Sequence, residues 1–297
     1  MPNLQSLHEL FCEHSLALKG NSPRTIRWLK EIFKYFSTQA GVANASEIDQ
    51  ITVERWLLQG KLEKKWSAKT IRTRMCALGL FFKWLVERNY LESNPIDRIP
   101  KPKLPKKLPK SLTKEEALTL LDWSKHLDYT FAFERNRAQA IMGLFIFTGI
   151  RKQELLNLKL HDVDLENRTL FVQSGKGEKD RLIPLNAKVL QLLRQYLETR
   201  KKRNAQSMSF FISLRYDIPM GEGAVKRLFD KLKERSGIAF SAHPLRHTFA
   251  TLMLEGGCDI YSLSKMMGHS DIKTTTIYLS ATVTQLQRQI TKHPLNF

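Results

Sequence analysis

Apolar positions over residues 1–99 recur at the three- and four-residue spacing of amphipathic α-helices. Ser22 and Pro23 supply a helix N-cap and a first-turn proline, and an apolar stripe follows them. A second stripe begins after Ser67. The two stripes consist of Ile26, Leu29, Ile32, Phe33 and Phe36, and of Ile71, Met75, Leu78, Phe82 and Leu85. Both stripes predict buried helix faces, so residues 1–99 are expected to form a small helical domain.

Basic side chains accompany the second stripe. Lys69, Arg72 and Arg74 fall mostly off the apolar face, where they could contact phosphates. For any one of them the alternative is an ordinary solvated cation on a helix face. We keep the three as candidate phosphate-binding residues.

Residues 100–110 interrupt the helical pattern with four prolines and five lysines. Proline forbids a helix or a central strand and favours an extended path, so this segment is predicted to be a semi-rigid cationic linker. Lys101, Lys103, Lys106 and Lys107 are candidates for contacts to a polyanion. The alternative is a solvated spacer without a binding role.

Residues 111–297 follow a mixed pattern. Thr113 to Glu116 form a capping box that opens a helix, and the apolar run from Ile141 to Ile150 predicts a buried helix ending near Gly149. Thr169–Gln173 and Arg181–Pro184 read as two short strands joined by a glycine-containing turn, and helical signals return afterwards. The predicted fold class is mainly α with a small β-sheet (α+β).

The net charge favours one class of partner, and the cysteine spacing argues against a zinc site. Lys and Arg number 48 against 29 Asp and Glu, so the formal net charge is +19, which favours a polyanionic partner. The three cysteines lack the spacing of a zinc site. The first residues lack a basic stretch followed by an apolar run, and no apolar run reaches membrane-spanning length, so neither secretion nor membrane insertion is expected. A cytoplasmic protein without a membrane partner is expected.

Four short segments place phosphate-directed or proton-transferring side chains beside helix ends or turns. They are Thr148–Leu155 with Arg151 and Glu154, Gly175-Lys176-Gly177, His243-Pro244-Leu245-Arg246, and Gly268-His269 followed nine residues later by Tyr278. Guanidinium groups suit phosphate chemistry because they bind two oxygens at once and stay protonated at physiological pH. A phenol has an ordinary pKa of about 10, so Tyr278 needs nearby cations to act as a nucleophile at neutral pH.

Taken together, in this order and spacing, the four segments resemble the tyrosine recombinase (phage integrase) family, which cuts and rejoins DNA through a phosphotyrosine. The resemblance extends from about residue 111 to the C-terminus. The helical domain and the linker are similar to the family's core-binding domain, which makes the cations of residues 69–74 and 101–107 candidate DNA-binding residues. One departure is Met266-Met267, where the family commonly has an aliphatic pair before Gly-His.

The resemblance also implies a role for each candidate. Arg151, Arg246 and His269 would stabilise the transition state at the scissile phosphate, and Tyr278 would attack it. A structural alternative exists for each: a surface ion pair for the arginines and amphipathic packing for the tyrosine.

Three further roles follow from the same resemblance. His243 would assist proton transfer at the tyrosine, or else simply cap a helix. Lys176 would protonate the departing 5′ oxygen, with Lys179 as the substitute if Gly-Lys-Gly is an ordinary hairpin tip. Glu154 would brace Arg151, or else be a surface acid.

No cofactor and no metal is expected, because the sequence carries neither an acidic magnesium-type cluster nor a nucleotide-binding loop. Val283, Leu286 and Ile290 form a short apolar stripe near the end of the chain. By resemblance to the Xer branch this stripe would dock on a neighbouring protomer of a DNA-bound tetramer, of this chain alone or with a second recombinase. The alternative is packing on its own domain.

The predicted function is therefore site-specific recombination of double-stranded DNA through a 3′-phosphotyrosyl intermediate. Its role would be Xer-like chromosome or plasmid dimer resolution, or integration and excision of a mobile element. Two alternatives remain open: DNA relaxation of the type IB topoisomerase kind, and a non-catalytic architectural DNA-binding protein.

Overall fold

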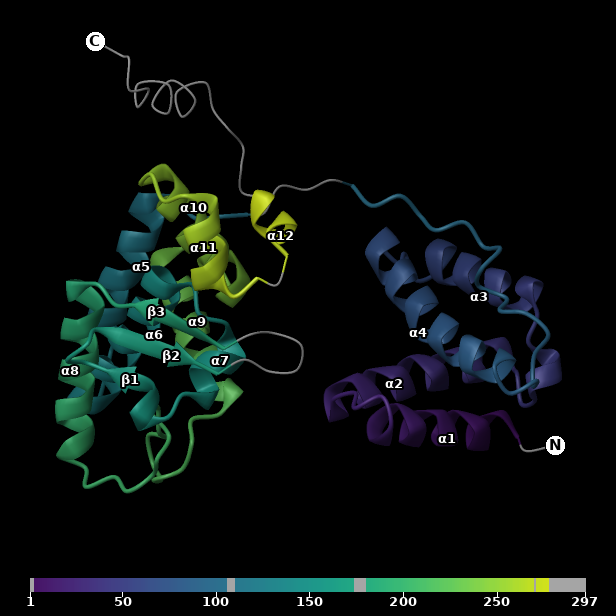
Figure 1. The fold of residues 1–297 in the computed structure, drawn as a ribbon, viewed down its shortest axis with the longest axis horizontal. Helices are drawn as coiled ribbons and strands as arrows, with labels where there is room; N and C mark the ends of the chain where they lie inside the picture. Colours follow the sequence, from purple (N-terminus) through teal and green to yellow (C-terminus); the bar gives the residue numbers. More distant parts are fainter. Residues whose placement is uncertain (1–2, 106–109, 174–179, 270, 278–297) are drawn as a thin grey trace, which may run out of the picture. The chain divides into compact units, whose positions relative to one another are not determined.

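A computed structural model of the chain describes residues 3–105, 110–173, 180–269 and 271–277 (Figure 1). The chain divides into two compact units, residues 1–106 and residues 107–297. The division falls inside the proline- and lysine-rich segment of residues 100–110.

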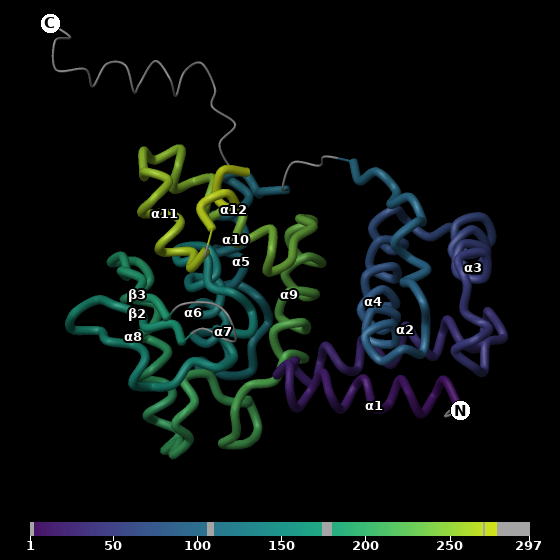
Figure 2. Tube along the Cα trace, turned by 45° about the vertical axis from the view of Figure 1, so that its right-hand side comes forward, coloured from purple at the N-terminus to yellow at the C-terminus, as the bar shows by residue number. Residues whose placement is uncertain are grey.

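Unit 1 is built from helices. They are α1 (Leu4–Ala17), α2 (Pro23–Ala40), the 3₁₀ turn η1 (Ala45–Glu47), α3 (Gln50–Leu62) and α4 (Ala68–Val86). The predicted N-caps are confirmed: the Ser22 side chain accepts the Thr25 amide and the Ser67 side chain accepts the Thr70 amide. Helix α1 packs against α2 and α4, and α3 packs against α2 and α4 (Figure 2).

The core of unit 1 is rich in aromatic rings. Both predicted apolar stripes are buried, and Phe36, Phe81 and Phe82 are almost fully enclosed. His8 lies among these rings, stacked on Phe33 with 3.9 Å between ring centroids. Burial, with the charge of Lys30, lowers the pKa of His8 to about 3, so the imidazole is neutral in the folded protein.

Unit 2 is built mainly from helices, with α6 (Ala132–Thr148) at its centre. The helices are α5 (Lys114–His126), α6 (Ala132–Thr148), α7 (Lys152–Asn157), η2 (Leu160–Asp162), α8 (Ala187–Lys201), α9 (Glu222–Ser236), α10 (Ala242–Glu255), α11 (Ile260–Met267) and α12 (Lys273–Thr276). Helix α6 contacts α5, α8 and α10 and is buried on nearly every side. The capping box at Thr113 and the end of α6 at Gly149 are as predicted.

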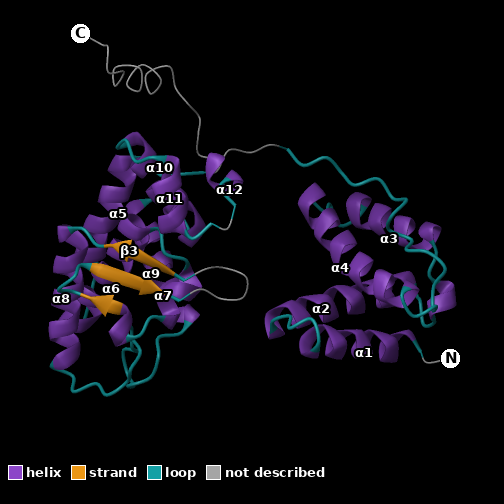
Figure 3. Cartoon of the chain, in the orientation of Figure 1, coloured by secondary structure: helices purple, strands orange, loops and turns teal. Residues whose placement is uncertain are grey.

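A small antiparallel sheet lies beside these helices (Figure 3). Its strands are β1 (Val163–Asp164), β2 (Thr169–Val172) and β3 (Arg181–Pro184), in that spatial order. Strand β1 was not predicted, because two residues carry no readable alternation. Strand β3 is an edge strand in this sheet, where Pro184 removes no ladder bond that the sheet needs. Its alternation buries Arg181 and Ile183 and leaves Leu182 exposed.

The observed fold is mainly helical with one small sheet, so the predicted α+β class is confirmed. Helix α11 packs against both α10 and β3, which brings the segment around residue 268 next to the sheet. Among the described helices, none combines the length and the apolar character needed to span a bilayer.

Candidate active site

The site begins where α6 ends. Gly149 caps this helix with a φ of +60°, and a Cβ at this position would lie 2.4 Å from the Phe249 ring. Glycine is therefore needed here both for the left-handed backbone and for the close approach of α10. The turn places Ile150 in the core and Arg151 at the N-cap of α7, with its side chain 25% exposed.

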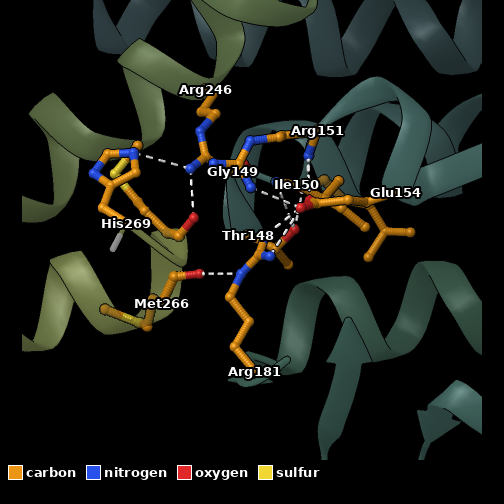
Figure 4. Close-up of polar contacts among 11 residues, drawn as sticks. Thr148, Gly149, Ile150, Arg151, Glu154, Arg181, Arg246, Met266 and His269 are labelled. Atoms are coloured by element: carbon orange, nitrogen blue, oxygen red, sulfur yellow. Dashed lines mark hydrogen bonds and ion pairs between the residues drawn. The ribbon is translucent and has the colours of Figure 1, made fainter. Parts of the chain in front are cut away.

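Glu154, three residues further on, lies between two arginines (Figure 4). Its Oε1 accepts bonds of 2.8 Å from Nη1 of Arg151 and from Nη1 of Arg181. Its Oε2 accepts the Arg151 amide and Nη2 of Arg181, again at 2.8 Å. Burial alone would raise the pKa of Glu154, but the bonds from Arg181 and Arg151 outweigh it and bring that pKa to about 2.

Arg246, on the first turns of α10, is buried and ties two segments together. Its Nη1 donates to the Gly149 carbonyl at 2.7 Å, and its Nη2 donates to the Met267 carbonyl. The same Nη2 lies 3.1 Å from Nε2 of His269. Arg246 therefore connects the end of α6 with the turn that follows α11.

His269 is held on both ring nitrogens. Since Arg246 can only donate, Nε2 of His269 accepts, and Nδ1 carries the proton that it donates to Oγ1 of Thr275 at 2.7 Å. Burial, and then the charges of Arg246, Arg151 and Arg181, lower the pKa of His269 to about 4. His269 is therefore neutral at physiological pH in this structure.

Three guanidinium groups and one carboxylate thus meet where α6, α7, β3, α10 and α11 approach one another. The carboxylate compensates one of the three positive charges, so the cluster keeps an excess of positive charge. Such a cluster can bind an oxyanion and stabilise charge that develops on it. The described residues include no group of three or more His, Cys, Asp or Glu that could hold a metal ion.

Comparison with known proteins agrees with this chemistry. Residues 110–285 match the model of the phage integrase family. The chain belongs to that family. The tyrosine recombinase XerA of Thermococcus onnurineus is 33% identical to it over 287 residues, covering 96% of this chain and 95% of that protein. The chain is thus a tyrosine recombinase of the Xer-like branch.

Solved structures of recombinases share the fold. The crystal structure of XerA recombinase is 27% identical, with a TM-score of 0.54, and covers 98% of this chain and 100% of that one. The XerH site-specific recombinase bound to its palindromic difH substrate is 25% identical, with a TM-score of 0.66. That match covers 82% of this chain and 72% of the XerH chain.

Three residues of the family motifs remain to be placed: His243, Lys176 and Tyr278. His243 is exposed on the first turn of α10, one turn before Arg246 and His247. Burial lowers the pKa of His247, and the charges of His243 and Arg246 lower it further. Two predicted catalytic residues, Lys176 and Tyr278, lie outside the described residues, as does the predicted docking stripe near the end of the chain.

The candidate DNA-binding cations of unit 1 differ in their surroundings. Lys69 and Arg72 are exposed on α4, whereas the guanidinium of Arg74 lies 3.9 Å from the ring centre of Trp66 and 4.6 Å from that of Tyr35. Lys101 and Lys103 are exposed in the linker; Lys106 and Lys107 lie outside the described residues. Contacts of these cations with DNA stay predictions.

Sequence reasoning missed two members of this candidate site, Arg181 and Thr275. A signal for Arg181 was available, because the period-two alternation of β3 puts it on the same face as the buried Ile183. A buried arginine needs a partner, and the acid of the Arg151 motif was the obvious candidate. No comparable signal marks Thr275 among the neighbouring threonines Thr274 and Thr276.

Proposed function

We propose that this protein is a site-specific recombinase that cleaves and rejoins DNA strands through a 3′-phosphotyrosyl intermediate. The observation that carries the proposal is the cluster in which Glu154 holds Arg151 and Arg181, while Arg246 contacts His269. This cluster brings together residues from three of the four family motifs, and its excess of positive charge supports a role in phosphate binding. The XerH relative, solved on its difH substrate in a post-cleavage complex, supports double-stranded DNA as the substrate.

In the proposed reaction Tyr278 attacks the scissile phosphate and expels the 5′ oxygen, which Lys176 protonates. His243 assists removal of the phenolic proton. Arg151 and Arg246 bind the non-bridging oxygens, on which negative charge increases in the transition state. A 5′ hydroxyl of the partner strand then attacks the phosphotyrosine, which releases Tyr278 and forms the new phosphodiester. The bond energy is conserved, so no external energy source is needed.

His269 fits this scheme through its charge. In the described state its Nε2 accepts from Arg246 and cannot donate to a phosphate. A phosphodiester beside the ring would raise the pKa of His269, because an opposite charge favours the protonated form. Protonation of Nε2 ends its bond from Arg246, and the imidazolium then donates from Nε2 to the phosphate while Nδ1 keeps its bond to Thr275.

The assembly and the biological role belong to the proposal as well. We infer a tetramer on two duplexes, joined through the C-terminal segment, of this chain alone or with a second recombinase. The role is dimer resolution of the Xer kind or integration and excision of a mobile element, in the cytoplasm. Lys69, Arg72, Arg74 and the lysines of the linker would contact the DNA backbone.

The test is covalent capture on DNA. The full chain is incubated with a pool of nicked suicide duplexes whose core sequence is randomised, and denaturing electrophoresis separates covalent adducts. We expect an adduct with the wild type, none with Tyr278→Phe, and an unchanged amount with Tyr261→Phe, the matched control. An adduct that persists in Tyr278→Phe would contradict the assignment of the nucleophile.

The same adducts separate the alternatives. Sequencing of the captured DNA gives the preferred site, and two marked duplexes bearing this site then test strand exchange. Exchange supports recombination, whereas relaxation of supercoiled DNA without exchange would indicate topoisomerase-like activity. DNA binding without any adduct across the pool would indicate an architectural protein.

A further inference from the structure

Arg181 makes three hydrogen bonds within the site, although it belongs to none of the four motifs. Its Nη1 and Nη2 donate to the two carboxylate oxygens of Glu154, and its Nε donates to the Met266 carbonyl, each at 2.8 Å. The side chain is only 5% exposed. Figure 4 shows it reaching between Glu154 and Met266. A group so enclosed is poorly placed to touch DNA and acts through its neighbours.

The first of these neighbours is Arg151. Each oxygen of Glu154 accepts one bond from Arg151 and one from Arg181. The paired bonds from Nη1 and Nη2 of Arg181 therefore fix the plane of the carboxylate, and the carboxylate in turn fixes the guanidinium of Arg151. A single-point cation at position 181 could contact one oxygen but could not fix that plane.

The second neighbour is the turn that carries His269. The successive carbonyls of Met266 and Met267 each accept a bond from a different guanidinium, Arg181 and Arg246. Two arginines from separate elements thus hold the backbone immediately before the Gly-His motif.

Gly268 shows how closely Arg181 approaches this turn. The residue has a φ of +66°, and a Cβ built on it would lie 2.8 Å from Cδ of Arg181 and 3.0 Å from its Nη1. A side chain at position 268 would therefore require either Arg181 or this turn to shift. The close approach of Arg181 thus depends on the absence of a side chain at Gly268.

We propose that Arg181 is a positioning residue of the recombination site, which aligns Arg151 through Glu154 and holds the turn of His269 through the Met266 carbonyl. The inference rests on the proposed function, because it assigns Arg181 to the cleavage step. A displaced phosphate-binding group lowers the rate on the order of 100-fold, so an effect of that size is expected when Arg181 no longer makes its paired bonds to Glu154.

The test measures single-turnover adduct formation on a suicide duplex captured by the wild type. Arg181→Lys is expected to lower this rate about 100-fold while the Kd for DNA stays within about twofold. Arg200→Lys is the matched control. Arg200 is a buried arginine of unit 2 that donates to the carbonyls of Ser207 and Ser209. This control is expected to lose stability but to keep the cleavage rate.

A double-mutant cycle separates positioning from a general loss of stability. In the Glu154→Gln background the carboxylate route is already broken, so Arg181→Lys should add less than about tenfold there. Full additivity of the two rate effects would overturn the proposal, and so would a single variant that cleaves within twofold of wild type. Arg181→Gln carries the same expectations should Arg181→Lys fail to fold, as judged by circular dichroism.

Failure of the inference is distinguishable from failure of the proposed function. If the wild type forms the adduct but the rate effects of the Arg181 and Glu154 substitutions are fully additive, the positioning role alone is overturned. Absence of any wild-type adduct would overturn the recombinase proposal, and the role of Arg181 with it.

Discussion

The two units enclose arginine in opposite ways. In unit 1 the guanidinium of Arg74 lies over the rings of Trp66 and Tyr35, and burial lowers its pKa. In unit 2 Arg181 makes a bidentate ion pair with Glu154. Rings offer a cation a polarised face but no compensating charge, whereas a carboxylate neutralises it and dictates its orientation.

This difference matches the work expected of each unit. A DNA-binding surface gains from cations that keep their charge available for phosphates. A reaction centre needs side chains fixed to within a fraction of an ångström, which bidentate bonds provide. Unit 1 thus orients Arg74 by stacking, whereas unit 2 orients Arg151 and Arg181 by a shared carboxylate.

Removal of the shared carboxylate should have the largest effect on stability. Glu154→Gln leaves Arg151 and Arg181 facing each other without a compensating charge, and should lower the free energy of unfolding of unit 2 by about 3 kcal/mol. Calorimetry, with hydrogen exchange on peptides from α6 and α7, measures this loss. Asp162→Asn is the control, since that buried carboxylate accepts the Lys159 amide. An equal loss in both variants would mean that the two arginines do not depend on Glu154.

Acid should weaken unit 1 through His8. The pKa of His8 is about 3 when folded and 6.5 ordinarily, so the unfolded chain binds the extra proton between these values. The contribution of His8 is therefore fully present above pH 6.5 and declines as the pH falls, by about 2 kcal/mol at pH 5. The stability that Glu154 supplies, with its pKa lowered to about 2, is lost only as the pH falls below 4.5.

Denaturant unfolding at pH 7 and pH 5, followed by tryptophan fluorescence, measures this loss. Four of the five tryptophans, Trp28, Trp56, Trp66 and Trp84, belong to unit 1, so the signal is nearly specific to it. His269 shifts in the same direction within unit 2, which makes a unit-specific signal necessary. His8→Gln should remove most of the difference between the two pH values. An undiminished difference in this variant would assign the acid sensitivity to another group.

Loss of stacking at Arg74 should have the smallest effect. Arg74→Lys keeps the charge but not the planar face, and should lower the stability of unit 1 by about 1 kcal/mol in the same fluorescence assay. Arg72→Lys, on an exposed position of α4, should change it by less than about 0.5 kcal/mol. Equal effects of the two variants would show that the aromatic rings do not support Arg74.

Local signals made much of the fold predictable. The caps at Ser22, Ser67 and Thr113 and the glycine that ends α6 fixed helix boundaries, because each satisfies backbone groups within a few residues. Strand β1 could not be predicted from the sequence, because its existence depends on pairing with β2 rather than on its own two residues.

The site was predictable only in part for a similar reason. Arg151, Arg246 and His269 lie in short motifs, and the structure joins them. The bonds that join them run through Arg181, Thr275 and the carbonyls of Gly149, Met266 and Met267. Which side chain meets a backbone carbonyl 85 positions away depends on the packing of α10, α11 and β3, which no local pattern records.

The most direct test of the account is to locate the covalent bond. The wild-type adduct is digested with nuclease and trypsin, and mass spectrometry identifies the peptide that carries the nucleotide. We expect the peptide of residues 274–288, modified on Tyr278. A nucleotide on any other residue would contradict the assignment of Tyr278 as the nucleophile and the reaction scheme built on it.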